Sequence, residues 1–117
     1  MSFDYFYGNQ AEQFSFYKIP KMLFTDEKFR VLSTDAKIVY GILLDRMNLS
    51  MRNQWLDEQG RVYIIFTIQE LMDCIGCKNQ KACQLMAELK EVSLIETKRQ
   101  GRGSPNLIYV RNFITRG

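Results

Sequence analysis

Polar and basic side chains gather in two short stretches in the last 40 residues of the 117-residue chain. The first stretch opens an expected helix and consists of Lys78, Asn79, Gln80, Lys81 and Gln84. Amide side chains can pair bidentately with adenine, and a lysine can reach guanine acceptors or a phosphate. These residue types therefore indicate a helix that reads DNA bases, although a merely solvated helix face would have the same composition.

The second stretch is the tip of an expected hairpin, and it contains Lys98, Arg99 and Arg102 among glycines. A tight turn needs only Gly, Asn or Asp for its backbone angles, so the charges serve either solubility or contact with a negative partner. On DNA, such side chains would hold the sugar-phosphate backbone. They would position the protein, whereas Gln80, Lys81 and Gln84 would specify sequence.

The charge distribution favours the nucleic-acid interpretation of both stretches. Residues 1–77 contain 8 Lys and Arg against 10 Asp and Glu, a net charge of −2. Residues 78–117 contain 8 Lys and Arg against 3 Asp and Glu, a net charge of +5. One basic end on a nearly neutral chain is the pattern expected of a nucleic-acid-binding surface.

The elements around these stretches predict how they are held. Thr67 and Glu70 form a capping box that begins a short helix, and Gly76 is placed to end it. A second helix follows from Asn79 with an apolar arc made of Ala82, Leu85, Met86 and Leu89. Two helices joined by a glycine-containing turn are a helix-turn-helix signature. Strands at 94–97 and 106–111 then make this a winged helix, with the basic tip as its wing.

The rest of the chain predicts an α+β fold. Ser33 begins a long helix that should end near Leu49, and the apolar run 62–66 after the turn 57–60 forms a strand or an extra hairpin. We therefore expect a winged helix-turn-helix domain at 33–117, preceded by an N-terminal arm at 1–32. The first 17 residues hold 7 of the 15 aromatic residues, so the arm should pack on the domain or on a partner subunit.

Several function classes are disfavoured. The chain has no histidine and no nucleophile elbow, P-loop or dinucleotide motif, so we expect no catalytic residue and no cofactor. Cys74, Cys77 and Cys83 have no fourth soft ligand, so we expect partly buried thiols and no metal site. No apolar run is long enough to span a bilayer, and the N-terminus does not resemble a secretory signal. The expected location is cytoplasmic.

Several longer runs resemble the RepA-type plasmid replication initiators of Gram-positive bacteria. The resemblance covers nearly all of residues 14–113. It rests on FYKIPKMLF (16–24), LSTDAK (32–37), LDRM (44–47), WLDEQGRVYI (55–64) and the wing-like TKRQGRGSPNLIY (97–109).

The resemblance implies an N-terminal winged-helix domain that binds double-stranded DNA at repeated origin sites (iterons) to initiate plasmid replication. It also implies a homodimer, and a separate C-terminal region that recruits host replication proteins. Because the chain stops at Arg116-Gly117, we expect it to be the N-terminal domain without that region. A winged-helix transcriptional regulator and a winged helix used only for protein interaction remain as alternatives.

Overall fold

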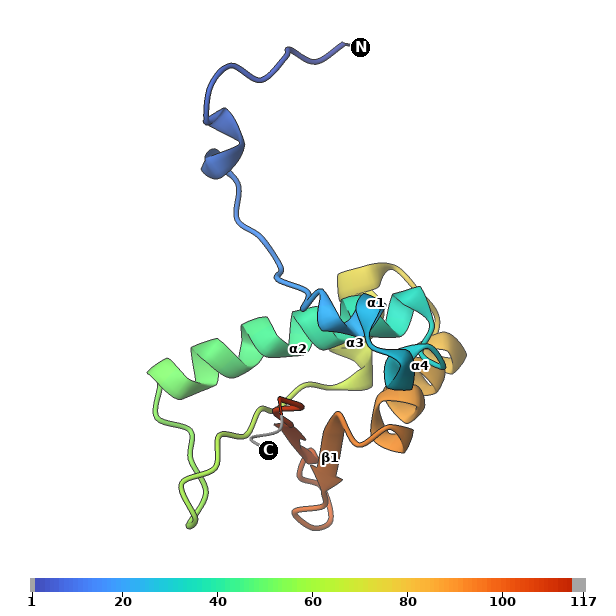
Figure 1. Ribbon diagram of the computed structural model, residues 1–117. Coiled ribbons are helices and arrows are strands. Elements are labelled where there is room, and N and C mark those ends of the chain that lie inside the picture. The colour runs from blue at the N-terminus through green and yellow to red at the C-terminus, as the bar shows by residue number, and fades with distance from the viewer. Residues whose placement is uncertain (1, 115–117) are drawn as a thin grey trace.

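The fold was analysed in a computed structural model that describes residues 2–114. Three longer helices stack beside one two-stranded antiparallel sheet, and α2 runs across the sheet (Figure 1). The elements are η1 (Gln10–Gln13), α1 (Met22–Thr25), η2 (Glu27–Phe29), α2 (Thr34–Arg52), α3 (Ile68–Ile75), α4 (Asn79–Glu91), β1 (Ile95–Lys98) and β2 (Leu107–Val110).

The hydrophobic core lies where the helices meet the sheet. It takes side chains from every layer, including Leu23 from α1, Leu43 from α2, Leu71 from α3, Leu85 and Leu89 from α4, and Ile108 from β2. Burial of these side chains is the main favourable contribution to the stability of so small a domain, and it fixes α4 against α2 and α3 against α4.

The predicted helix boundaries are confirmed where capping residues define them. The Ser33 Oγ accepts a hydrogen bond from the Ala36 N–H at 3.1 Å, and the Thr67 Oγ1 accepts one from the Glu70 N–H at 3.0 Å. Gly76 ends α3 with a left-handed φ of 69°. The end of α2 has no such signal, and the helix continues three residues beyond the expected Leu49.

The sheet is smaller than predicted. Strands β1 and β2 pair with Thr97 opposite Ile108, but the apolar run 62–66 forms no named strand. Ile64 instead makes a single antiparallel bridge to Ile108, with two 2.9 Å backbone hydrogen bonds, and Leu56 makes another to Val62. The expected strand or extra hairpin is therefore a loop with one internal bridge, between Leu56 and Val62, and one bridge to the edge of β2, at Ile64.

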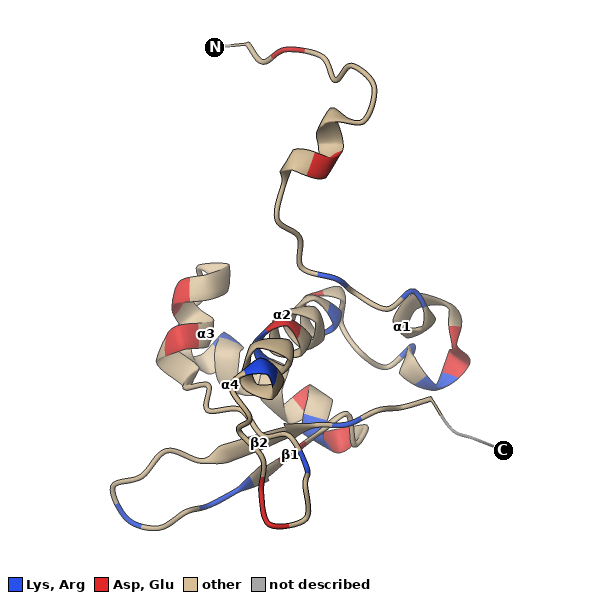
Figure 2. Ribbon diagram, turned by 90° about the vertical axis from the view of Figure 1, so that its left-hand side faces the viewer, with Lys and Arg blue, Asp and Glu red and all other residues tan. Residues whose placement is uncertain are grey.

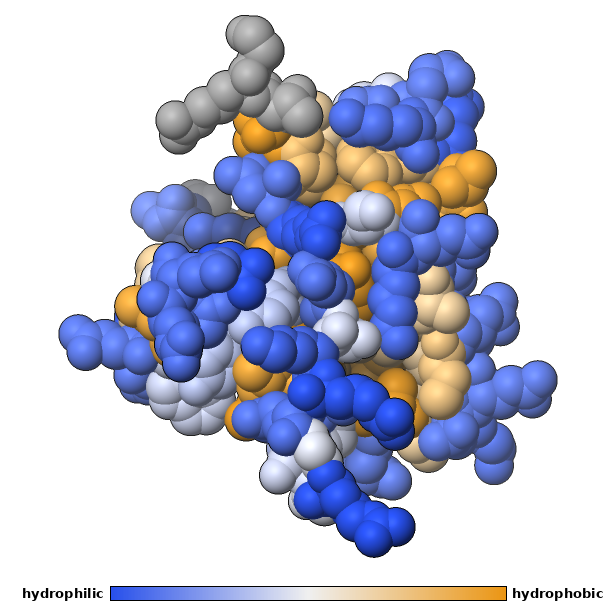
Figure 3. Space-filling view, turned by 90° about the horizontal axis from the view of Figure 1, so that it is seen from below, coloured by the Kyte–Doolittle hydropathy of each residue, from blue (hydrophilic) through white to orange (hydrophobic). Residues whose placement is uncertain are grey.

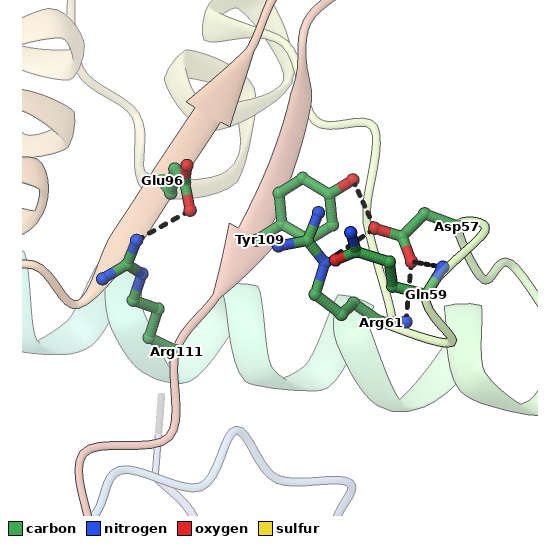
Figure 4. A network of polar contacts seen from close by, with 6 residues as sticks. All are labelled: Asp57, Gln59, Arg61, Glu96, Tyr109 and Arg111. Carbon is green, nitrogen blue, oxygen red and sulfur yellow. Dashed lines mark hydrogen bonds and ion pairs between the residues drawn. The ribbon is translucent and has the colours of Figure 1, made fainter.

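A carboxylate holds this loop in place (Figure 4). Asp57 accepts hydrogen bonds from the Gln59 N–H (2.9 Å), the Arg61 N–H (2.8 Å), the Arg61 Nε–H (2.8 Å) and the Tyr109 hydroxyl (3.0 Å). Partial burial alone would raise the pKa of Asp57, but the four donors favour the charged form and hold its pKa well below the usual range. The charged carboxylate therefore links the 57–60 turn to β2.

Replacing Asp57 with Asn should lower the melting temperature at pH 7. A carboxyl group whose pKa is depressed by folding stabilises the native state above its unfolded pKa of about 4, and this stabilisation is lost as the pH falls toward the folded value. The difference in melting temperature between wild type and Asp57→Asn should therefore be smaller at pH 3 than at pH 7. Thermal unfolding followed by circular dichroism measures this difference. The matched control is Glu58→Gln on the same turn, where the carboxylate is exposed. An unchanged Asp57→Asn gap at pH 3 would contradict this account.

The N-terminal segment divides into two parts. Residues 2–17 extend away from the body (Figure 1), and their aromatic rings are exposed, from 51% for Phe14 to 88% for Phe3. The segment 18–32 belongs to the body, since Leu23, Phe29 and Leu32 are buried and the chain at Lys18 and Ile19 closely approaches Gly41 of α2. Residues 2–17 thus do not pack on their own domain, and the 1–32 boundary does not mark one uniform arm.

No helix in the part of the chain that the structure describes is both long and apolar enough to cross a membrane.

Candidate nucleic-acid interface

Helix α4 presents a polar face to solvent, as its pattern predicts. The apolar arc of Ala82, Leu85, Met86 and Leu89 is buried against α2 and α3. Gln80 and Gln84 lie one turn apart on the opposite face, and both side chains are exposed. Both amides can therefore contact the same partner molecule at neighbouring positions.

The N-terminus of α4 differs from those of α2 and α3. Its N-cap residue, Lys78, makes no side-chain cap hydrogen bond, and the first turn contains no acidic residue. The first backbone N–H groups of α4 are therefore left to outside acceptors, and the helix dipole adds positive potential there. Asn79 accepts a 3.6 Å hydrogen bond from the Cys83 thiol through its carbonyl oxygen, which leaves its NH₂ group to donate.

Lys81 is placed apart from the other predicted contact residues. Its ammonium group pairs with the Asp35 carboxylate at 3.3 Å, on the flank of α4 that faces the start of α2. On the same flank, Glu88 accepts hydrogen bonds from the Ser33 N–H at 2.8 Å and the Ser33 hydroxyl at 3.0 Å. This flank therefore fastens α4 to α2, and Lys81 must exchange Asp35 for a phosphate if it binds DNA.

The basic tip, residues 99–106, joins β1 to β2. Gly101 and Gly103 have φ values of 129° and 83°, a backbone region that other residues rarely adopt. The Gln100 side-chain amide donates to the Pro105 carbonyl at 2.8 Å and braces the turn. The loop carries only basic charges, whereas the neighbouring 57–60 turn carries acidic ones (Figure 2).

The three predicted cations of this region are exposed. Lys98 ends β1, and Arg99 and Arg102 lie in the basic tip. Within residues 2–114, the ion pairs found involve other side chains than these three. Their charges are therefore available to an anionic partner.

A groove of about 470 Å³ separates α4 from the basic tip. Lys90 of α4 lies on its wall, and so do Ser104 and Asn106 of the tip. We did not predict a role for Lys90 from the sequence. A helical wheel could have found it, because Lys90 lies seven residues after Cys83 on the flank that turns toward the following hairpin.

The cysteines differ from the expectation. Cys74 and Cys83 are exposed, and only Cys77 is partly buried. Free cysteines are often buried, but these three show that residue type alone did not predict the burial of each side chain. Among the described residues, no three His, Cys, Asp or Glu side chains are grouped as metal ligands would be.

Comparisons with known proteins agree on one family. A family model described as "Replication initiator protein A (RepA) N-terminus" matches residues 15–117. A "41 kDa protein" of Lactobacillus helveticus is 30% identical over 101 residues, which cover 81% of this chain and 29% of that protein. The chain thus spans less than a third of the length of this relative.

Solved structures resemble the whole fold. One named "N-Terminal domain of DNA binding protein" superposes with a TM-score of 0.80 at 36% identity, over 98% of this chain and 88% of that one. "Structure of Rep-DNA complex" gives 0.79 at 37% identity, over 97% and 88%. "Structure of MDR initiator" gives 0.74 at 37% identity, over 93% and 86%.

Proposed function

Because the chain belongs to the family of replication initiator protein A N-termini, we propose that it binds origin DNA in a sequence-specific way and thereby helps to start replication. In this proposal α3 and α4 are a helix-turn-helix, and the hairpin of β1 and β2 is its wing. The DNA is double-stranded, and its target is a set of repeated origin sites.

One observation carries the proposal: α4, which exposes the amides of Gln80 and Gln84, lies across a groove from a hairpin tip whose charged side chains are all basic. In this proposal Gln80 and Gln84, which are both exposed, meet base edges in the major groove, where an α-helix fits. Lys98, Arg99 and Arg102, which are also exposed, meet the adjacent sugar-phosphate backbone in this proposal. Lys78 and Asn79 lie at the uncapped helix start, which favours a phosphate.

The solved relatives support the same assignment. A structure named as a Rep-DNA complex has the same fold at 37% identity, and another is named as the domain of a DNA-binding protein. The side chains of this chain then decide which bases are read, since fold alone does not fix a target.

A replication assay separates an initiator from a transcriptional regulator of the same fold. A plasmid carrying the candidate origin should be maintained when the longer protein that contains this domain is supplied, and lost when the domain carries Gln80→Ala and Gln84→Ala. The control is a plasmid with scrambled repeats, which should be lost in either case. Maintenance without the protein would favour the regulator.

The protein-interaction alternative is favoured by a different observation, the exposed aromatic rings of residues 2–17. We infer that these rings serve a homodimer rather than a function that replaces DNA binding. Residues 2–17 contain two acidic residues, Asp4 and Glu12, and no Lys or Arg, so they are unsuited to nucleic acid. Rings this exposed gain free energy by burial against protein.

Removing residues 2–17 should therefore shift the protein from dimer to monomer. Sedimentation velocity at tens of micromolar should show the full chain as a dimer and the shortened chain as a monomer with unchanged helix content. The matched control replaces Asp4 and Glu12 with Asn and Gln, which keeps every ring and should keep the dimer. A monomeric full chain would contradict the dimer proposal while leaving DNA binding untouched.

The proposal leaves host proteins to the remainder of the longer protein. The chain spans 29% of its Lactobacillus relative, and we propose that recruitment of host replication proteins belongs to the other part. For this domain we propose binding alone, without a catalytic residue, a metal or a cofactor.

A further inference from the structure

The groove between α4 and the basic tip has a composition that suits a phosphodiester strand. Its polar lining consists of one ammonium group, three hydroxyls, one thiol and one amide, on Lys90, Thr67, Thr97, Ser104, Cys83 and Asn106. These groups come from the start of α3, from α4, from β1 and from the chain just before β2, so residues far apart in sequence converge on one groove. All six can donate hydrogen bonds, and among the described residues no carboxylate lines the groove.

The floor of the groove is apolar. Phe66, Met86 and Ile108 line it, and all three are buried in the core. A floor of carbon with donors along the rim matches a sugar-phosphate strand, in which deoxyribose carbon alternates with anionic oxygen. Seen from the side where the tip and the 57–60 turn project (Figure 3), the surface is mainly hydrophilic, with apolar groups visible between the polar ridges.

We propose that this groove holds the sugar-phosphate backbone of one DNA strand and that Lys90 pairs there with a phosphate. The inference rests on the proposed function and adds a contact that the sequence did not predict. If the amides of α4 read bases and the tip reaches the backbone beyond, one strand must pass between them. Lys90 is the only Lys or Arg that lines this passage among the described residues.

A single cation from the described part of the chain lines the groove, which favours a strand over a small anion. An isolated phosphate would gain little there, because its charge would stay hydrated and the lining offers one cation. A DNA strand brings the phosphate to the lysine with binding energy from α4 and the tip. Titration calorimetry with inorganic phosphate alone should accordingly show no binding, and saturable binding would overturn the strand assignment in favour of a small-anion site.

The main test compares Lys90→Ala, Lys90→Arg and the matched control Lys28→Ala, which removes an exposed lysine of η2. Affinity for origin repeats and for a scrambled duplex would be measured by fluorescence anisotropy across a salt series. Lys90→Ala should reduce the slope of log affinity against log salt by about 1 and weaken both duplexes by the same factor. Lys90→Arg should restore the slope, and Lys28→Ala should leave it unchanged.

A neutral backbone scan then locates the contact. Methylphosphonate linkages placed singly along each strand should reveal one position that weakens wild type but does not weaken Lys90→Ala further. Such non-additivity marks a direct pair. If wild type binds selectively but Lys90→Ala keeps the full salt slope, the groove assignment is overturned and the proposed function stands. If wild type binds no DNA, both fail together.

Discussion

Replacing Lys98, Arg99 and Arg102 together with alanine should weaken binding to every duplex by on the order of a hundredfold at low salt. Each exposed ion pair with a phosphate is worth up to about 1 kcal/mol, and three together approach two powers of ten. Each phosphate contact contributes about 0.9 to the salt slope, so the slope should fall by roughly 3. Because the wing residues touch no base edge in our account, the ratio of affinities for origin repeats and scrambled DNA should change little.

The control for this variant removes the same charge elsewhere. Lys21, Lys28 and Arg30 are exposed near α1, on the other side of the domain from the basic tip (Figure 2). Replacing these three with alanine lowers the net charge equally and should reduce the salt slope by far less. Equal reductions in the two variants would mean that net charge, and not a wing contact, drives binding.

Replacing Gln80 or Gln84 with alanine should have the opposite signature. A bidentate amide–adenine pair is worth about 1–3 kcal/mol of discrimination, so affinity for origin repeats should fall roughly five- to 150-fold for whichever glutamine makes such a pair. Binding to scrambled DNA should hardly change, and neither should the salt slope. Both side chains are exposed, so the variants should fold as wild type does.

The position of the loss is also predicted. Changing the contacted base pair in the repeat should lower the affinity of the wild-type protein. The same change should leave the affinity of the alanine variant as it was. Asn48→Ala serves as the control, because it removes an exposed amide from α2. Losses of the same size on repeats and scrambled DNA would remove Gln80 and Gln84 from the reading role.

Local signals explain why much of the fold could be predicted from sequence. Capping residues act over three or four positions, so Ser33, Thr67 and Gly76 revealed where helices begin and end. The buried arc of α4 followed from periodicity alone. The hairpin was predictable because glycines separate two apolar runs, and the order of these elements led to the helix-turn-helix prediction.

The errors come from contacts between distant segments. The run 62–66 has the residue types of a strand, but only Ile64 pairs with β2, and Val62 pairs with Leu56 across the turn instead. Lys81 and Glu88 look like solvated charges on the wheel of α4, yet the start of α2 takes both of them. Residues 18 and 19 pack closely on α2 at Gly41, where a side chain would collide with them. No local sequence pattern reveals this contact, which separates residues 18–32 from residues 2–17.

The same reason accounts for the missed groove. Lys90 lies near the end of α4, and Ser104 and Asn106 follow it by more than ten residues in the chain. Only the fold brings the three side chains to one groove. Sequence reasoning found the groups that lie close together in the chain, Gln80 with Gln84 and Arg99 with Arg102. It did not find a site that α4, β1 and the tip build jointly.

The central claim is selective binding of duplex DNA by α4 and the wing, and fluorescence anisotropy tests it most directly. The wild-type protein would be titrated against a labelled duplex of repeats from the origin of its own replicon and against a scrambled duplex of equal length, both across a salt series. We predict tighter binding to the repeats at every salt concentration, with a steep salt dependence for both duplexes. Equal and weak binding to the two duplexes would contradict the claim, because only a nonspecific basic surface would remain.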